Sequence, residues 1–488
     1  MTVSRRTFLR ASLLSASGLL APEGVLPAFA AMANGARDTA YGYGPLLADP
    51  AGLLELPAGF QYRMLSPGST RAAGAMEDRF RSSLSTGEPT PGLHDGMAAF
   101  AGPDGMTILV RNHELNLGDE PEVDRARRRP YDAKTAGGTT TLWVNRDREL
   151  VKAFPSLSGT LRNCAGGPTP WGTWLTAEES CYVPGEKNAV NADMDPGVSQ
   201  RHGYIFEVDS LSEALVDPVP LKAMGRFRHE AVAVDPTTGY AYLTEDRDDS
   251  LLYRFRPAAL AEGKLPSDLR AGDYARGGTL EALRVSARPK LVTNNWSAIA
   301  IAPAGHTHAI DWVPIPDHDP DMDMTHPAGD AVNEITAPTA TRAQGFGLGC
   351  AQFARTEGIV FALGSVYFCC TSGGARKLGQ VFCLDLRRQR LSLVVEPDKD
   401  AVLDGPDNIC VAPNGDLVIC EDNLAQRSNF LVGVTKRGSC YRIARNAHPS
   451  SKELAGSCFS PDGRTLFVNV QEPGQTFAIW GPWEKRRG

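Results

Sequence analysis

Acidic or thiol residues recur at the start of six short apolar segments of this chain. The starts are His94-Asp95-Gly96, Asn163-Cys164-Ala165, His229-Glu230-Ala231, Thr356-Glu357-Gly358, Asp407-Asn408-Ile409 and a degraded Ala455-Gly456-Ser457. The matching ends are Asn112-His113-Glu114, Ala177-Glu178-Glu179, Leu243-Thr244-Glu245, Cys370-Thr371, Cys420-Glu421 and Gln471-Glu472. Charge that recurs at one depth of a repeat architecture meets at one point in space, so the pattern predicts a shared site.

The residue types at the starts predict that this site binds metal ions. The residues expected around the central axis are Asp95, Cys164, Glu230, Glu357 and Asn408. The trailing glutamates, among them Glu114, Glu179 and Glu421, are expected on the neighbouring strand of each repeat. Carboxylates gathered without a cation raise one another's pKa and destabilise the fold. Carboxylate oxygens suit Ca²⁺ or Mg²⁺ and a thiolate suits iron or zinc, so we expect a mixed site; for any one residue alone, the alternative is a solvated turn.

An arginine and three histidines flank the expected ligands. Arg355 lies two residues before Glu357, so on a strand both side chains point to the same face. There Arg355 could bind an anion such as phosphate through two hydrogen bonds; the alternative is a salt bridge to Glu357 alone. His94, His113 and His229 could support the ligands, act as general acids, or be structural.

The repeat unit reads as strand, turn, strand and predicts an all-β fold. Turn sequences such as Ala101-Gly102-Pro103-Asp104-Gly105 and Ala412-Pro413-Asn414-Gly415-Asp416 suit hairpins, because Pro presets one dihedral and Gly tolerates positive φ. Hairpins that recur at spacings of 50 to 66 residues indicate a six-bladed β-propeller with loop insertions. The stretch 54–65 is expected to supply a strand that closes the ring with the last blade.

The N-terminus predicts export. Residues 1–30 read as a twin-arginine signal peptide with Arg5-Arg6, a short apolar stretch and an Ala28-Phe29-Ala30 cleavage site, which leaves residues 31–488 as a single domain. No later segment is apolar enough for a permanent membrane span. The whole chain has a net charge of −7, and the signal carries three Arg and one Glu, so the remainder is at −9, which argues against a nucleic-acid partner. Most of the ten cysteines lie in strand-like runs and are expected to be buried free thiols.

The segment 163–179, which runs from Asn163-Cys164 to Glu178-Glu179, closely resembles the most distinctive segment of the PhoX-type alkaline phosphatases. Further similar segments are Arg111 to Glu114, Arg228 to Ala231, Ala354 to Gly358, Gly405 to Asn408 and Cys420 to Asp422. The resemblance implies two ferric and three calcium ions bridged by an oxo group. It also implies Cys164 and Glu230 as iron ligands, and Glu179, Glu357 and Glu421 as ligands of iron or calcium.

The resemblance further implies hydrolysis of phosphate monoesters. After twin-arginine export we expect the protein to be a monomer in the periplasm or outside the cell. In the implied mechanism the cations offset charge in the transition state and supply the nucleophile, Arg355 binds the substrate phosphate, and Cys164 and Glu357 serve catalysis through the metals. Two other classes stay open. A calcium-dependent propeller lactonase or esterase would have little use for Cys164, and a non-catalytic binding propeller would hold no metal.

Overall fold

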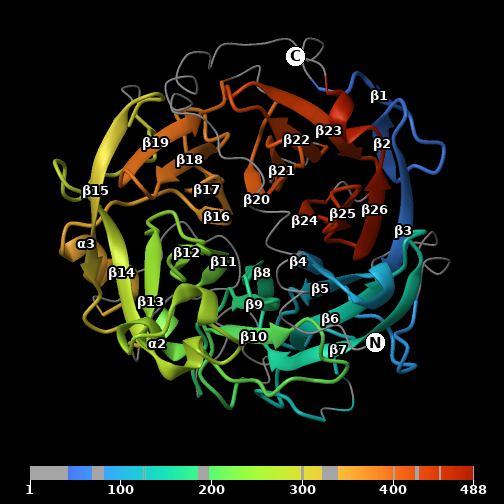
Figure 1. The fold of residues 1–488 in the computed structure, drawn as a ribbon, viewed down its shortest axis with the longest axis horizontal. Helices are drawn as coiled ribbons and strands as arrows, with labels where there is room; N and C mark the ends of the chain where they lie inside the picture. The colour runs from blue at the N-terminus through green and yellow to red at the C-terminus, as the bar shows by residue number, and fades with distance from the viewer. Residues whose placement is uncertain are drawn as a thin grey trace.

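The chain folds as a ring of small antiparallel sheets around a central axis (Figure 1). The computed structural model describes residues 42–68, 82–124, 126, 128–184, 197–297, 302–320, 339–398, 402–423, 428–449 and 452–486. The all-β propeller predicted from the repeats is confirmed. The expected signal peptide, residues 1–30, lies outside the described residues.

Each sheet begins with an inner strand at the axis and continues outward through the following strands. In chain order the groups are β4 (His94–Ala101), β5 (Thr107–His113), β6 (Gly137–Val144) and β7 (Leu150–Thr160); β8 (Asn163–Pro168), β9 (Thr173–Glu178) and β10 (Ile205–Asp209); β11 (His229–Val234), β12 (Ala241–Glu245), β13 (Tyr253–Pro257) and β14 (Gly278–Val285); β16 (Thr356–Ala362), β17 (Ser365–Cys370), β18 (Gln380–Asp385) and β19 (Arg390–Val395); β20 (Pro406–Val411), β21 (Leu417–Glu421), β22 (Phe430–Val434) and β23 (Cys440–Asn446); β24 (Leu454–Phe459), β25 (Thr465–Val470) and β26 (Gln475–Trp480). We refer to these six groups as blades 1 to 6. The inner strands β4, β8, β11, β16, β20 and β24 each contact the next, and β24 contacts β4, so the ring is closed.

The N-terminal segment adds two main strands to the ring where the sequence suggested one, and the second of them joins the last blade. β3 (Gln61–Pro67) pairs antiparallel with β26 and completes blade 6. β2 (Leu54–Pro57) instead pairs with β23 at the outer edge of blade 5, and β1 (Leu46–Leu47) pairs with β2. The turn after Pro57 separates the two strands, and Phe60 N–H donates to Pro57 O at 3.1 Å. In Figure 1 the blue N-terminal strands lie beside the red C-terminal ones.

The predicted hairpin turns join inner strands to their neighbours. Between β20 and β21, Ala412 N–H donates to Asp416 O at 2.8 Å and Gly415 N–H donates to Ala412 O at 2.8 Å. Gly415 has φ of +83°, which a glycine adopts without steric cost. This turn therefore fixes where β20 ends and β21 begins.

The hydrophobic core is divided among the contacts between neighbouring blades. Blades 1 and 2, for example, pack through Ile108 and Val110 against Trp174 and Phe206. Comparable clusters join every other neighbouring pair, including blades 6 and 1. The ten cysteines are free and seven of them are buried, five of these in the clusters, as the sequence predicts. The packing of apolar faces around the ring leaves the polar inner strand ends to face the axis.

Outside the blades, the described residues include few helical segments. These are α2 (Ala258–Ala261), α3 (Thr341–Gly347) and short 3₁₀ turns at Pro103–Gly105, Lys222–Met224, Pro266–Asp268, Tyr274–Arg276 and Trp483–Lys485. β15 (Thr307–Pro314) joins β14 to β19 and so links blades 3 and 4. No helix among the described residues is long and apolar enough to cross a membrane.

Candidate metal centre

One backbone hydrogen bond repeats in every blade and sets the geometry of the site. It runs from the N–H of the residue after the second strand to the C=O of the residue before the inner strand. The pairs are Glu114 to Leu93, Glu179 to Arg162, Asp246 to Arg228, Thr371 to Arg355, Asp422 to Gly405 and Gln471 to Glu453, at 2.9–3.2 Å. The six blades can therefore be compared position by position.

Each inner strand also carries a β-bulge close to its first residue. The register shifts after His94, Asn163, His229, Thr356, Pro406 and Ala455. A bulge re-aims the side chains beside it. The second residues of the six inner strands are Asp95, Cys164, Glu230, Glu357, Asp407 and Ala455. Five of the six carry a metal-binding side chain.

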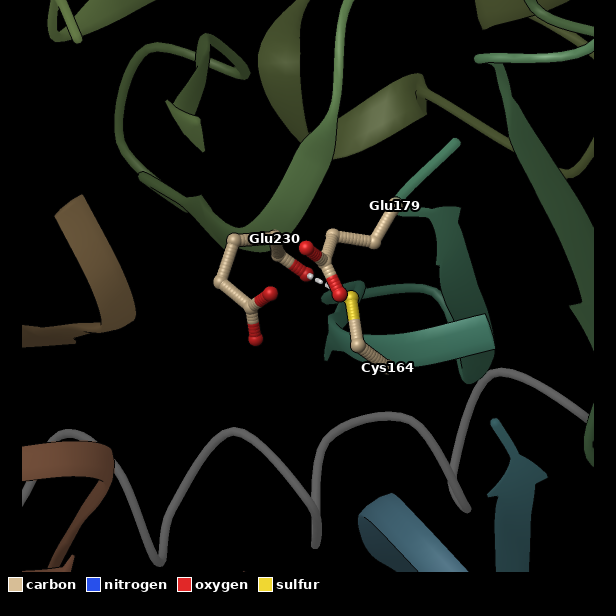
Figure 2. A group of neighbouring side chains, drawn as sticks. All are labelled: Cys164, Glu179 and Glu230. Atoms are coloured by element: carbon tan, nitrogen blue, oxygen red, sulfur yellow. Dashed lines mark hydrogen bonds between the residues drawn. The ribbon is translucent and has the colours of Figure 1, made fainter. Parts of the chain in front are cut away.

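The first ligand group contains the thiol. Cys164 of β8, Glu179 just after β9 and Glu230 of β11 place ligand atoms within 4.8 Å of one another, and all three are buried. Figure 2 shows these side chains converging from two neighbouring blades. Burial and the nearby carboxylates raise the pKa of the Cys164 thiol well above its usual value, and burial raises the pKa of Glu179 to about 7. A buried thiol and carboxylates that resist ionisation suit a cation that would replace their protons.

The second ligand group shares Glu230 with the first. Glu230, Glu357 and Asp407 have carboxylate oxygens within 4.8 Å of one another, and all three are buried. Burial, followed by repulsion from neighbouring carboxylates, raises the pKa of Glu230 and Glu357 well above the usual value. Burial raises the pKa of Asp407 to about 8. Because Glu230 belongs to both groups, two cations could sit side by side here.

The third ligand group contains only oxygen donors. Asp95 of β4, Glu114 just after β5 and Glu453 just before β24 lie within the same 4.8 Å limit. Burial is the largest cause of the raised pKa of both Asp95 and Glu453. An all-carboxylate set of this kind suits a hard cation such as Ca²⁺.

Two of the expected ligands lie outside these groups. Glu421 ends β21, and its carboxylate accepts hydrogen bonds from the N–H groups of Asp404 at 2.9 Å and Phe430 at 3.0 Å. Asn408 follows Asp407 in the bulge: its amide donates to Asp407 Oδ1 at 3.0 Å and accepts from Gly456 N–H at 2.6 Å. Glu421 thus braces the end of blade 5, and Asn408 orients Asp407.

Glu421 lies outside the ligand groups because side chains alternate between the two faces of a strand. Glu178, Glu245 and Glu421 occupy the last residue of their strands, opposite the first residue of the inner strand. Successive side chains point to opposite faces, so the next residue, which is Glu179, Asp246 or Asp422, turns toward the axis. Glu245 instead accepts a hydrogen bond from Tyr253 and pairs with the buried Arg342.

The sequence reading therefore missed four acidic residues at or beside the site: Asp246, Asp407, Asp422 and Glu453. The repeat at 407–409 contains both Asp407 and Asn408, and the structure places Asp407 in a ligand group where the sequence predicted Asn408. Glu453 lies one residue before β24, in a repeat judged degraded because position 455 is alanine. Aligning the six repeats on the residue before the inner strand would have found it.

Three blades place an arginine at the position that Glu453 occupies in blade 6. Arg162 binds Glu114 Oε1 at 2.8 Å and Glu179 Oε2 at 3.0 Å, and so links two ligand groups. Arg228 donates to the backbone oxygen of Glu179 at 3.2 Å.

Arg355, the third of these arginines, contacts two carboxylates. It donates to both carboxylate oxygens of Asp246, at 2.7 and 3.1 Å, and to Glu357 at 3.0 Å. The expected pair with Glu357 exists, and Asp246 is the second partner. No described residue accepts a hydrogen bond from Nη1 of Arg355, whose side chain is 20% exposed.

The three flanking histidines are buried and neutral. His94 and His113 surround the buried Arg111, which donates to His94 Nδ1 at 3.2 Å and to Thr140 at 3.1 Å. Burial lowers the pKa of both, and it lowers that of His229 to about 3. Each histidine directly precedes a ligand residue in sequence and points to the opposite face of the strand. These side chains therefore support the backbone of the site.

Comparison with known proteins agrees with this geometry. The family described as Alkaline phosphatase PhoX matches residues 41–474. No curated protein matches the chain in sequence. The structure of Pseudomonas fluorescens PhoX in complex with vanadate, a transition state analogue, is 17% identical, with a TM-score of 0.66 over 91% of this chain and 98% of that one.

Other solved structures match the chain less well. Virginiamycin B lyase from Staphylococcus aureus is 11% identical over 86% of this chain and 99% of that one, with a TM-score of 0.36. The Pseudomonas aeruginosa periplasmic gluconolactonase is 13% identical over 78% and 79%, with a TM-score of 0.35.

Proposed function

Because the chain belongs to the PhoX family of alkaline phosphatases, we propose that it hydrolyses phosphate monoesters and releases inorganic phosphate at the axis of the propeller. The observation that carries the proposal is the pair of ligand groups joined by Glu230, with Arg355 in contact with Glu357 of the second. The Arg355 guanidinium thus lies beside two ligand groups that could together hold two or more cations. Phosphoryl transfer needs positive charge placed around the transferred group.

The donor types suggest how metals would be distributed. Cys164, Glu179 and Glu230 offer one sulfur and carboxylate oxygens, which favours iron. Asp95, Glu114 and Glu453 offer only oxygen, which favours calcium. The proposed cofactors are two ferric and three calcium ions, with Glu357 and Asp407 completing the shared group. When bound, such cations neutralise charge on the phosphoryl oxygens and activate the attacking oxygen.

The protein's own residues would hold and orient the substrate phosphate. Asp246 fixes the Arg355 guanidinium through Nε and Nη2, so the fork is oriented before substrate binds. A preorganised donor adds more to transition-state stabilisation than a mobile one, because no reorganisation accompanies the reaction. Arg162 and Arg228 would keep Glu179 in place from two sides.

The proposal also covers export of the protein and its location. Residues 1–30 would direct the chain to the twin-arginine export machinery, and residues 31–488 would act as a monomer in the periplasm or outside the cell. Export in the folded state would let the cluster assemble before the protein leaves the cytoplasm.

The test is hydrolysis of p-nitrophenyl phosphate at alkaline pH by purified protein, with and without a calcium chelator, together with its iron content. We expect chelator-sensitive turnover and bound iron. Cys164→Ala should lose iron and nearly all turnover while circular dichroism shows an unchanged fold. Full turnover by Cys164→Ala with unchanged metal content would contradict the assignment of this site. A calcium-only protein that cleaves lactones, or one with no metal and no turnover, would support the other propeller classes.

A further inference from the structure

Arg162 contacts two different ligand groups through one nitrogen atom. Its Nε lies 2.8 Å from Glu114 Oε1, in the oxygen-only third group, and 3.0 Å from Glu179 Oε2, in the thiol-containing first group. Both glutamates are buried, whereas the Arg162 side chain is 28% exposed. The orientation of one ligand in each group therefore depends on the same guanidinium.

The contact with Arg162 leaves the second oxygen of Glu179 available to a cation. Oε1 of Glu179 is buried and accepts no hydrogen bond from any residue that the structure describes. The Arg228 guanidinium lies 3.7 Å from it, which is too far for a hydrogen bond. A buried oxygen without a partner is costly, and a bound metal ion would satisfy it. Arg162 thus fixes one oxygen of Glu179 while the other remains free to bind metal.

The backbone of Arg162 is strained, which indicates that its side chain is needed. Its φ is +52°, in the left-handed region that glycine adopts at the lowest cost. The equivalent position of blade 5 is Gly405, with φ of +64°. In blade 1 it is Leu93, at +46°, whose side chain packs on an apolar cluster, and in blade 4 it is Arg355, at +54°, which contacts Glu357. A strained residue beside a site points to a function for its side chain.

We propose that Arg162 is a positioning residue that couples metal binding at the first ligand group to metal binding at the third. The inference rests on the metal centre of the proposed function. A cation in the third group would fix Glu114, and the shared guanidinium would then hold Glu179 in place. Each group is therefore better ordered when the other is occupied, and ordered ligands bind metal more tightly. Linkage makes the effect on affinity equal in both directions.

Competition for ferric iron at low and at saturating free calcium tests the coupling. Metal-loaded protein is equilibrated with a ferric-iron chelator, and bound iron and calcium are measured by elemental analysis. In the wild type, calcium should raise the iron affinity about tenfold, as expected for a group that orients metal ligands. In Arg162→Gly the two iron affinities should agree within about twofold, because no shared nitrogen remains. Arg162→Lys keeps a cationic N–H donor and should restore most of the calcium effect.

Arg148→Gly is the matched control. Arg148 also has a positive φ, +63°, but lies in the turn between β6 and β7, where its Nε donates to Thr465 at 3.1 Å. This variant should keep the wild-type calcium effect, and circular dichroism should show an unchanged fold for all three variants.

The outcomes separate this inference from the proposed function. A calcium effect that persists in Arg162→Gly, is lost equally in Arg148→Gly, or is absent from the wild type would overturn the coupling and leave the phosphatase function intact. Coupling that disappears in Arg162→Gly, in a protein that turns over no phosphate ester, would support the role of Arg162 and count against the phosphatase function.

Discussion

Arg355 and Asp246 form a two-point ion pair across neighbouring blades, with Nε–Oδ1 at 2.7 Å and Nη2–Oδ2 at 3.1 Å. Asp246 is largely but not fully buried, which disfavours its charge, but Arg355 holds its pKa well below the usual value. Asp246 therefore stays ionised throughout the working pH range. This pair orients the proposed phosphate-binding fork independently of Glu357.

Substitutions in this pair should lower turnover more than stability. Arg355→Lys loses the two-point geometry, and kcat/KM for p-nitrophenyl phosphate should fall about 100-fold, as when a transition-state donor is removed. Asp246→Asn keeps the shape but loses the charge, and a smaller fall of about tenfold is expected. Arg254→Lys, in the two-point pair with Glu281 at 2.6 and 2.8 Å between the outer strands β13 and β14, is the matched control and should leave kcat/KM unchanged. A fall as large in the control would show a general effect on folding.

Replacement by glutamine should reduce metal content at Glu453 and reduce stability at Glu421. Glu453 shares a ligand group with Asp95 and Glu114, so Glu453→Gln should reduce the calcium content measured by elemental analysis. Glu421 accepts two backbone N–H groups, so Glu421→Gln should lower the free energy of unfolding by about 1–2 kcal/mol with full metal content. Loss of metal in Glu421→Gln alone would reverse the assignment.

Metal removal should destabilise the protein more at high pH than at low pH. Without cations the pKa of Glu179 is about 7 and that of Asp407 about 8, both raised first by burial. Since these carboxyls hold protons in the folded state but not in the unfolded state above pH ~4.5, the stability of stripped protein falls as pH rises from there through 8. The gap in Tm between loaded and stripped protein should therefore widen from pH 5.5 to pH 8.5 in differential scanning fluorimetry. A constant gap would argue against protons taking the place of cations.

Metal binding should also release protons. Calorimetric titration of stripped protein with metal at pH 6.5, in two buffers of different ionisation enthalpy, should give different observed heats. Identical heats in both buffers would mean that the carboxyls and the thiol were already ionised.

His202 should make folding sensitive to alkaline pH. It is fully buried between Glu178, at 2.7 Å, and Asp132, at 3.5 Å, and beside the edge of Tyr131. Burial opposes its charge, but the two carboxylates prevail and raise its pKa to about 9. Its stabilising effect, on the order of 3 kcal/mol, is thus complete below pH ~6.5 and is lost as pH rises through 9. In urea unfolding of metal-loaded protein, the free energy of unfolding of the wild type should fall between pH 7 and 10. That of His202→Gln should be lower at pH 7 and change less with pH.

The propeller and most of its site could be predicted from the order of residues along the chain. Hairpin turns recur with the apolar segments, so the number and order of repeats follow from local chemistry. Asp95, Cys164, Glu230 and Glu357 were identified because each begins a repeat, and the structure brings each of them into a ligand group.

Which of two neighbouring residues faces the axis could not be predicted, because it depends on how the folded strands pair. A strand turns successive side chains to opposite faces, so a one-residue difference separates Glu421 from Asp422 and Asn408 from Asp407. The bulge after each inner strand start, and the hydrogen bond between Gln471 N–H and Glu453 O, depend on how the two strands of each hairpin pair. Asp246 likewise meets Arg355 across 109 residues of chain, a contact that arises because the ring places blades 3 and 4 side by side.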